Sequence, residues 1–184
     1  YNDDGLEANH CYGYTVTMRD SAGTPNHTAT STASTTYTLA NVPGTITYSA
    51  VGTSSLTLTN DENGNPTANP ATAFAVYATS TDSRWNSYYV TAAGATSTSK
   101  TWLTDAQIDG LTLSGLLDFT SYSFSVMARN QDNIETASST ITATTTLDGT
   151  APTPNPPSFS TAPNGSAVDT VNMVAAAVSD VSTP

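Results

Sequence analysis

The chain has 184 residues, 37% of them hydrophobic, and its 15 acidic side chains against four Lys and Arg give a net charge of −11. This charge argues against binding to nucleic acid or to an anionic membrane surface, both of which call for a basic footprint. No apolar run is long enough for membrane insertion, and the length allows one or two domains. The chain opens on Tyr1 without a signal peptide, so we expect a processed protein or a piece of a longer one.

Residues 1–41 predict the last part of a β-sandwich domain. Residues 1–4 would finish one strand, and residues 12–19 form a second strand because apolar side chains occupy every other position. A turn-rich loop over residues 20–26 leads to a Thr-rich strand over residues 29–39. One face of the residue 12–19 strand carries Tyr12, Tyr14, Val16 and Met18.

Residues 42–148 predict one complete all-β domain without helices. The strands are expected where apolar and polar residues alternate or where β-branched residues gather. They lie around residues 46–51, 54–59, 74–78, 85–90, 111–113, 122–128 and 138–146, with a further strand or ordered loop from Trp102.

Residues 149–184 predict a linker and the first part of another sandwich domain. Residues 151–157 contain four prolines and should form a stiff extended linker. A strand is expected around Phe159 and a second over the alternating Val171, Met173, Ala175 and Ala177. A third strand should begin at the end of the chain, after Asp180.

The most informative pattern occurs twice. Residues 122–128 alternate as Tyr122, Phe124, Val126 and Ala128, and Tyr122 follows Gly115–Leu116 after a short loop. The same pattern follows Gly5–Leu6 as Tyr12, Tyr14, Val16 and Met18, at an offset of 110 residues. This offset is close to the length of one sandwich domain.

This stretch resembles strand F of a fibronectin type III (immunoglobulin-like) domain, together with its tyrosine corner. The resemblance implies β-sandwich repeats of a bacterial extracellular or surface protein, with Tyr122 in the core and its hydroxyl bonded to loop backbone. Residues 1–41 would then hold the end of strand E with strands F and G, and residues 158–178 strands A and B. The chain departs from the family pattern in lacking a Trp near the end of strand B, where we expect Leu58 to fill part of the volume.

The partial domains suggest assembly. Neither end can bury its apolar face alone, and open strand edges invite pairing with another chain. We expect a structural module of an extracellular filament or surface polymer, in which the front of one copy completes the back of the next, head to tail. The residues expected at this contact are Tyr12, Tyr14, Val16, Met18, Phe159, Val171 and Met173.

Two alternatives stay open. The chain could be a segment of a covalent multi-domain stalk of an adhesin or surface protein. It could also be a carbohydrate-binding accessory of a secreted polysaccharide-degrading enzyme, with sugars stacking on Trp85, Tyr88, Tyr89 and Trp102. No catalytic constellation is visible, so we expect no enzyme and no required cofactor.

A few residues are weak candidates for other sites. Asp20, Asp148 and Asp180 lie near the domain junctions and could share calcium, and Asp61 lies in a loop that only partly matches a calcium-binding pattern. Asn26 and Asn164 begin N-glycosylation sequons, so glycans are possible partners. Cys11 is the only cysteine, which leaves a free thiol or an intermolecular disulfide.

Overall fold

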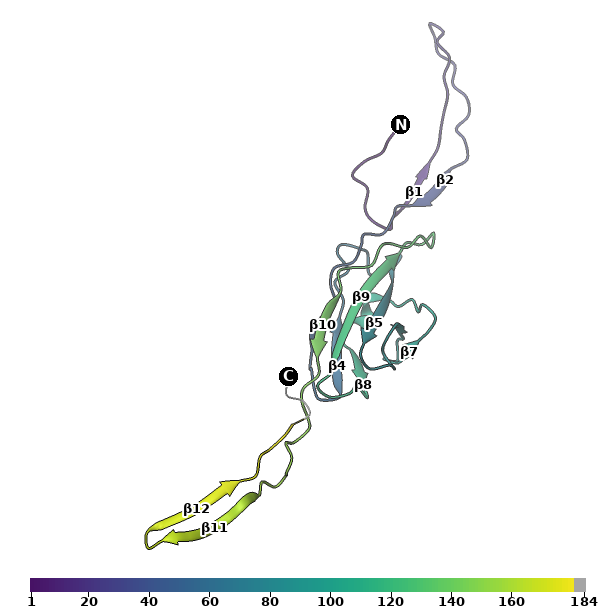
Figure 1. Cartoon of the computed structure of the whole chain (residues 1–184). Coiled ribbons are helices and arrows are strands. Elements are labelled where there is room, and N and C mark those ends of the chain that lie inside the picture. The colour runs from purple at the N-terminus through teal and green to yellow at the C-terminus, as the bar shows by residue number, and fades with distance from the viewer. Residues whose placement is uncertain (181–184) are drawn as a thin grey trace.

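A central β-sandwich with one hairpin projecting from each end makes up the molecule (Figure 1). The structure is a computed structural model that describes residues 1–180. The expected start of a third strand after Asp180 lies outside the described residues.

Two antiparallel sheets form the sandwich, which spans residues 42–148. The first sheet contains β3 (Thr47–Ser49), β4 (Ser55–Thr59) and β8 (Leu111–Ser114), in the order β3-β4-β8. The second has the order β10-β9-β5-β6-β7. Its strands are β5 (Ala73–Ser80), β6 (Tyr88–Val90), β7 (Thr96–Ser97), β9 (Ser121–Arg129) and β10 (Thr142–Thr145). The expected all-β, fibronectin type III-like sandwich is confirmed.

Strand β9 supplies one wall of the core. Tyr122, Phe124, Val126 and Ala128 have no exposed surface, as their alternation predicts. On the opposite sheet, the buried side chains are Ile46, Leu56, Leu58 and Leu113. Strand β5 pairs with β9 along its whole length, from Ala73↔Arg129 to Ser80↔Tyr122, so these two strands form the centre of the second sheet.

The large aromatic group of the core comes from an unexpected position. We expected Leu58 to fill part of the volume of the Trp that strand B lacks, and Leu58 is indeed buried, but Trp85 also occupies the core, only 5% exposed, from the turn between β5 and β6. Its ring meets those of Tyr122 and Phe124 nearly at right angles, with centroids 6.2 and 6.4 Å apart. Such edge-to-face contacts stabilise aromatic clusters beyond the area that they bury.

Three further expectations need correction. Residues 1–4 form no strand, although the Tyr14 hydroxyl donates a hydrogen bond to Asp3 Oδ2 at 2.9 Å. The strand expected over residues 85–90 is shorter and begins at Tyr88. The domain also contains a helical turn, α1 (Asp105–Ile108), which buries Ile108 and follows a capping box at Thr104.

The tyrosine corner is present in the complete domain. The Tyr122 hydroxyl accepts a hydrogen bond from the Leu117 backbone N–H at 2.9 Å and donates one to Asp82 Oδ2 at 3.0 Å. Asp82 is buried and also accepts two hydrogen bonds from the Arg84 guanidinium. Tyr122 thus connects the loop before β9 to the turn after β5.

The terminal hairpins contain the remaining strands. The first consists of β1 (Cys11–Tyr14) and β2 (Ser34–Tyr37), which are shorter than the strands expected over residues 12–19 and 29–39, and the second consists of β11 (Phe159–Ala167) and β12 (Thr170–Ala175). Each hairpin is a separate two-stranded sheet. Within residues 1–180, no helix is both long and apolar enough to cross a membrane.

Candidate functional site: assembly surfaces at the two ends

The β1–β2 hairpin pairs in the same register as the β9–β10 hairpin of the complete domain. Tyr12 lies opposite Thr36 as Tyr122 lies opposite Thr144, and Tyr14 lies opposite Ser34 as Phe124 lies opposite Thr142. The first strand of each pair is offset by 110 residues and the second by 108. The internal repeat of the sequence is therefore a repeat of strand pairing.

The hydrogen bonds beyond the regular ladder recur as well. Val126 receives a bond from the Ser139 N–H and donates to the Ser139 hydroxyl, at 2.7 and 3.0 Å. Val16 makes the same two bonds with Ser31, at 2.9 and 3.0 Å. Two residues further along the strand, Ala128 makes the same two bonds with Thr136, and Met18 makes them with Thr28. The distances are 2.8 and 3.0 Å in both.

The hairpin at residues 1–41 also has its own tyrosine corner. The Glu7 N–H donates to the Tyr12 hydroxyl at 3.1 Å, five residues apart as in the bond between Leu117 and Tyr122. Gly5 and Gly115 share a positive φ, +75° and +69°, at equivalent positions before each strand. A Cβ is unfavourable in this region, so glycine at both positions is part of the corner. Residues 1–41 thus have the geometry of strands F and G with their preceding loop.

The two hairpins differ in what covers them. In the complete domain β5 pairs with the side of β9 that faces away from β10, and the first sheet covers the apolar face of β9. Within the described residues β1 pairs only with β2. The side chains of Val16 and Met18 are 64% and 67% exposed, whereas Val126 and Ala128 at the equivalent positions are fully buried. Tyr12 is half-buried and Tyr14 is exposed.

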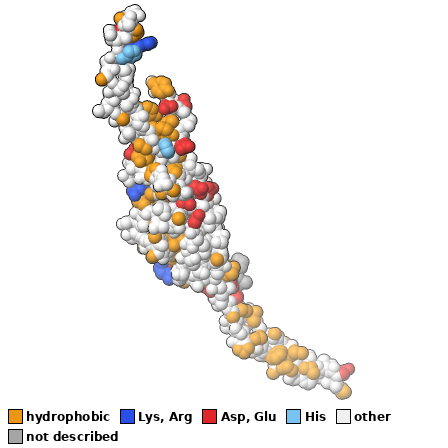
Figure 2. Space-filling view, turned by 180° about the vertical axis from the view of Figure 1, so that it is seen from behind, with side chains coloured by type: hydrophobic (Ala, Val, Ile, Leu, Met, Phe, Trp, Pro, Cys, Tyr) orange, Lys and Arg blue, Asp and Glu red, His pale blue; other side chains and the backbone are white. Residues whose placement is uncertain are grey.

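The C-terminal hairpin exposes its apolar side chains too. Every residue of β11 and β12 is exposed, including Phe159, Val171 and Met173. Figure 2 shows hydrophobic side chains gathered along this thin extension. By contrast, the β3–β4 pair of the complete domain packs Tyr48, Leu56 and Leu58 against the core. The pairing of β11 with β12 contains three register shifts, so it is less regular than the first hairpin.

A buried polar residue holds the first hairpin on the complete domain. Asn9 has no exposed surface, and its amide donates to Thr72 Oγ1 and accepts from the Gln131 N–H, both at 2.9 Å. The Asn130 amide, also buried, donates to the Thr38 carbonyl at 3.1 Å. These bonds bring the base of the hairpin to the loops before β5 and after β9, so the junction has a defined geometry. Our sequence analysis missed Asn9.

The connecting segment is fastened by asparagines as well. Asn41 and Asn65 exchange two hydrogen bonds, with the Asn41 N–H donating at 2.8 Å and the Asn65 amide donating at 2.9 Å. Gly44 passes so close to Asp61 that a Cβ on Gly44 would overlap the carboxylate. The junction at residues 38–44 is therefore packed and hydrogen-bonded rather than a free linker.

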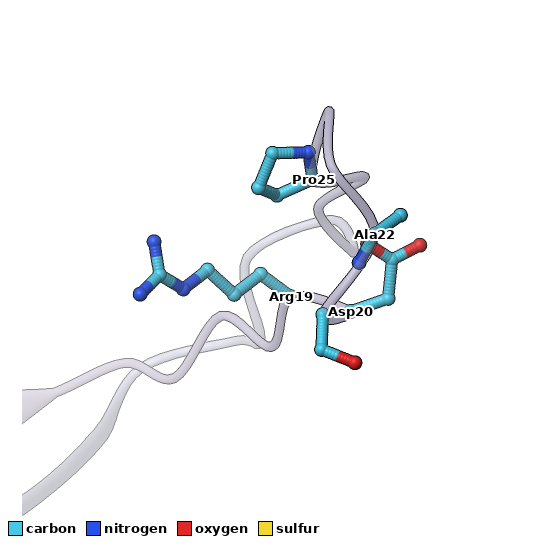
Figure 3. A pocket seen from close by; sticks show the side chains of 5 residues that line it. Arg19, Asp20, Ala22 and Pro25 are labelled. Carbon is cyan, nitrogen blue, oxygen red and sulfur yellow. The ribbon is translucent and has the colours of Figure 1, made fainter.

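Asp20 has a structural partner in its own loop. It caps the turn at the tip of the first hairpin, where Arg19, Asp20, Ser21, Ala22 and Pro25 line an open pocket (Figure 3). Hydrogen bonds from the backbone and side chain of Asn26 and from the Ala22 N–H lower the pKa of Asp20. At the equivalent position Asn130 accepts the same kind of bond, from the Ile134 N–H. A neutral amide suffices for this turn, which favours a capping role over metal binding.

The other acidic candidates do not form a cluster. Asp61 accepts from the Asn63 N–H at 3.0 Å, and Asp148 accepts from the Thr150 N–H at 2.8 Å. Asp180 follows Ser179, which pairs with Thr153 at the base of the second hairpin. In the part of the chain that the structure describes, no three His, Cys, Asp or Glu side chains gather as a metal site would require. Calcium binding stays a prediction.

Three of the four aromatic side chains considered for sugar stacking are engaged within the domain. Trp85 is part of the core, and Tyr89 meets Tyr77 edge-on at 5.2 Å. The Arg129 guanidinium lies over the Trp102 ring at 4.4 Å, and the Lys100 ammonium lies 5.4 Å from the same ring. These cation–π contacts occupy the ring that a sugar would stack on. The sugar-binding alternative gains no support from this arrangement.

The remaining candidates are at the surface. Asn26 is exposed near the tip of the first hairpin, and Asn164 is exposed within β11. Glycosylation at either residue stays a prediction. Cys11 is an exposed free thiol on β1.

Comparison with known proteins gives similarity at the level of the fold. No protein-family model and no curated protein sequence matches the chain. The structure is similar to the rat CD45 extracellular region, domains d3–d4, with 13% identity, 79% of this chain and 68% of that chain covered, and a TM-score of 0.44. It is also similar to the chicken CNTN1 FN1–FN3 domains, with 14% identity, 80% and 44% covered, and a TM-score of 0.41.

A third similar structure is the third fibronectin III domain of the human KIAA0343 protein. The identity is 20%, the coverage is 62% of this chain and 88% of that chain, and the TM-score is 0.38. The strand order and pairing of the chain itself define the class. Residues 42–148 form a fibronectin type III-like β-sandwich domain.

Proposed function

We propose that the chain is a structural spacer from a tandem array of fibronectin type III-like units in an extracellular or cell-surface protein, without catalytic activity. Domains of this fold usually serve as structural or adhesion modules. The observation that carries the proposal is the recurrence in residues 1–41 of the pairing register of the β9–β10 hairpin and of the hydrogen bonds beyond it, offset by 110 residues in the first strand and 108 in the second. A hairpin with the geometry of strands F and G belongs to a sandwich unit of its own.

The first junction suits a spacer. A spacer must hold neighbouring units at a defined distance and angle, which a freely hinged linker does not do. Asn9 and Asn130 fix the first hairpin to the complete domain through buried hydrogen bonds, so the unit that contains this hairpin is oriented too. The acidic surface suits such a role because like charges oppose lateral association of neighbouring arrays.

The missing strands of each end unit come, in this proposal, from adjacent residues of a longer polypeptide. The unit that contains β1 and β2 requires a strand along the free edge of β1 and a sheet over Tyr14, Val16 and Met18. A complete unit of the size of residues 42–148 supplies both within one chain. This is the covalent stalk arrangement.

Head-to-tail completion between copies is the second candidate, favoured by the exposed apolar faces at both ends. The β11–β12 hairpin of one copy would cover Tyr14, Val16 and Met18 of the next, as β3 and β4 help to cover β9. Such a joined unit would contain four strands and would leave the edge of β1 without the partner that β5 provides for β9. For this reason we place it second. In neither arrangement does a cofactor have a role.

Scattering measurements distinguish the two candidates. Small-angle X-ray scattering of the full chain over a range of concentrations should give an elongated particle of constant mass if the stalk proposal is correct. A mass that grows with concentration would favour head-to-tail copies. In that case Val16→Asp should abolish the growth and Thr17→Asp, on the opposite face of the same strand, should leave it. A compact particle with both hairpins folded back on the sandwich would contradict both candidates.

A further inference from the structure

The free edge of β1 is the feature that the proposed function leaves open. We define the β1 edge as the side of β1 (Cys11–Tyr14) and of the following residues 15–18 that faces away from β2. The Val16 and Met18 N–H groups donate to Ser31 and Thr28 on the β2 side. Backbone N–H groups alternate in direction along a strand, so those of Thr15 and Thr17 point to the β1 edge. The edge therefore offers unpaired donors beside an exposed apolar face.

The complete domain shows what occupies the equivalent edge. Along β9, strand β5 runs antiparallel with Tyr77 opposite Ser125, Val76 opposite Val126 and Ala75 opposite Met127. Phe74, Val76 and Ala78 of β5 point into the core and are fully buried. The partner that fits β9 is thus an extended strand with apolar residues at alternate positions.

We infer that the β1 edge binds an antiparallel strand in the register that β5 adopts on β9, supplied by a half-sandwich equivalent to strands A to E. This inference rests on the proposed function and specifies the partner of the first hairpin. The strand places its Val76 equivalent opposite Val16, its Tyr77 equivalent opposite Thr15 and its Ala75 equivalent opposite Thr17. The sheet that accompanies the strand covers Tyr14, Val16 and Met18.

Three observations on the hairpin support this register. Its inward residues are Tyr12, Tyr14 and Val16 where β9 has Tyr122, Phe124 and Val126, so most of the face matches in shape. Beyond the ladder with β2, the Val16 N–H donates to the Ser31 hydroxyl in place of a backbone carbonyl, just as the Val126 N–H donates to the Ser139 hydroxyl. This shared irregularity fixes which N–H groups point outward. Its tyrosine corner sets the same chain direction into the strand.

One position differs and sets the choice of test. Met18 stands where β9 has the fully buried Ala128, so a partner shaped for Ala128 is too tight for Met18. The residue of the native partner that contacts Met18 should therefore be smaller than the residue that contacts Ala128 in this domain. A test that uses the domain's own strands needs a variant with Met18→Ala and Tyr14→Phe, which makes the two inward faces identical.

The test supplies the missing half in cis. Residues 42–114 are placed directly before Gly5 of the chain, because Ser114 precedes Gly115, the equivalent of Gly5. Amide hydrogen exchange is measured at Thr15 and Thr17, with and without Met18→Ala and Tyr14→Phe. We expect protection of both amides to rise by about 100-fold or more when the added strands dock, since stable ladder bonds slow exchange in this way.

Disulfide trapping tests the register. With Cys11→Ser in every variant, Val76→Cys in the added half should cross-link to Val16→Cys. The matched control, Tyr14→Cys with the same Val76→Cys, should not cross-link because it lies two residues out of register. Residues on the non-hydrogen-bonded pair approach closely enough for a disulfide.

Two results overturn the inference. In the first, amide exchange at Thr15 and Thr17 stays as fast as in the unextended chain, even with Met18→Ala and Tyr14→Phe. The hairpin then does not accept these strands. Preferential cross-linking of the Tyr14→Cys control shows that the register is wrong. Either result leaves the spacer proposal to its own test, because particle length and mass in scattering do not depend on the added half.

Discussion

Replacing Tyr122 by Phe should destabilise the complete domain by about 2–3 kcal/mol. The substitution keeps the buried ring but removes the hydroxyl that accepts from the Leu117 N–H and donates to Asp82. A neutral hydrogen bond contributes about 1 kcal/mol and one to a charged group about 1.5–3 kcal/mol. Asp82 keeps its bonds to Arg84, so we expect the lower part of the sum. Tyr122→Ala also creates a cavity and should cost about 3–5 kcal/mol or more.

Equilibrium denaturation of the full chain, followed by tryptophan fluorescence, measures this loss. Trp85 contacts the Tyr122 ring and so reports on the same core. For a domain of about 100 residues, each kcal/mol also lowers Tm by about 4–8 °C. The matched control is Tyr12→Phe, which removes the equivalent hydroxyl from the first hairpin and should leave the unfolding of the complete domain within about 0.5 kcal/mol. Equal losses from both variants, or no loss from Tyr122→Phe, would refute the assignment of the core tyrosine corner.

Three more outcomes follow from the structure. Burial raises the pKa of Tyr122 to about 12, so the contribution of Tyr122 to the unfolding free energy should be complete below its ordinary pKa near 10 and should be lost as pH rises from 10 to 12; a Tyr122→Phe variant with an equally steep alkaline loss would contradict this. Asn9→Ala removes the two junction bonds of Asn9, to Thr72 and Gln131, and leaves those of Asn130 to Thr38 and of Tyr37 to Asp132; the unfolding of the sandwich should stay unchanged while NMR relaxation shows the first hairpin tumbling more independently of the sandwich, and unchanged tumbling would mean that Asn9 does not hold the junction. Removal of divalent cations with a chelator should leave Tm unchanged, since Asp20, Asp61 and Asp148 already accept hydrogen bonds in their own loops, and a drop of several degrees would show that calcium is bound.

Local patterns in the sequence predicted the parts of the fold that depend on local geometry. The alternation from Tyr122 to Ala128 identified a strand and its buried face, because side chains in a strand change sides at every residue. The repeat at Tyr12 predicted a second hairpin of the same kind, and the structure extends the match to the hydrogen bonds. The tyrosine corner was predicted from the spacing between Gly115 and Tyr122.

Features set by packing between distant segments leave no mark in the local sequence. Trp85 fills the core from a turn, where no periodic pattern marks the inward direction. The helical turn α1 is only four residues long, although Thr104 and Gln107 formed a capping box that could have been noticed. Asn9 bonds to residues 63 and 122 positions away, and nothing near it in the sequence distinguishes it from an exposed loop asparagine. The register that we propose for the partner of β1 rests on the β5–β9 pairing, which no local pattern in the sequence reveals.

The modular character of the chain is tested most directly by comparing the full chain with residues 42–148 alone. The terminal hairpins contribute no side chain to the buried hydrophobic core, and only a few hydrogen bonds join the first hairpin to the domain. We therefore predict that the isolated domain unfolds cooperatively, with an unfolding free energy within about 1–2 kcal/mol of the value for the sandwich in the full chain. An isolated domain that fails to fold, or that loses much more than this, would show that the hairpins are part of the domain rather than parts of neighbouring units.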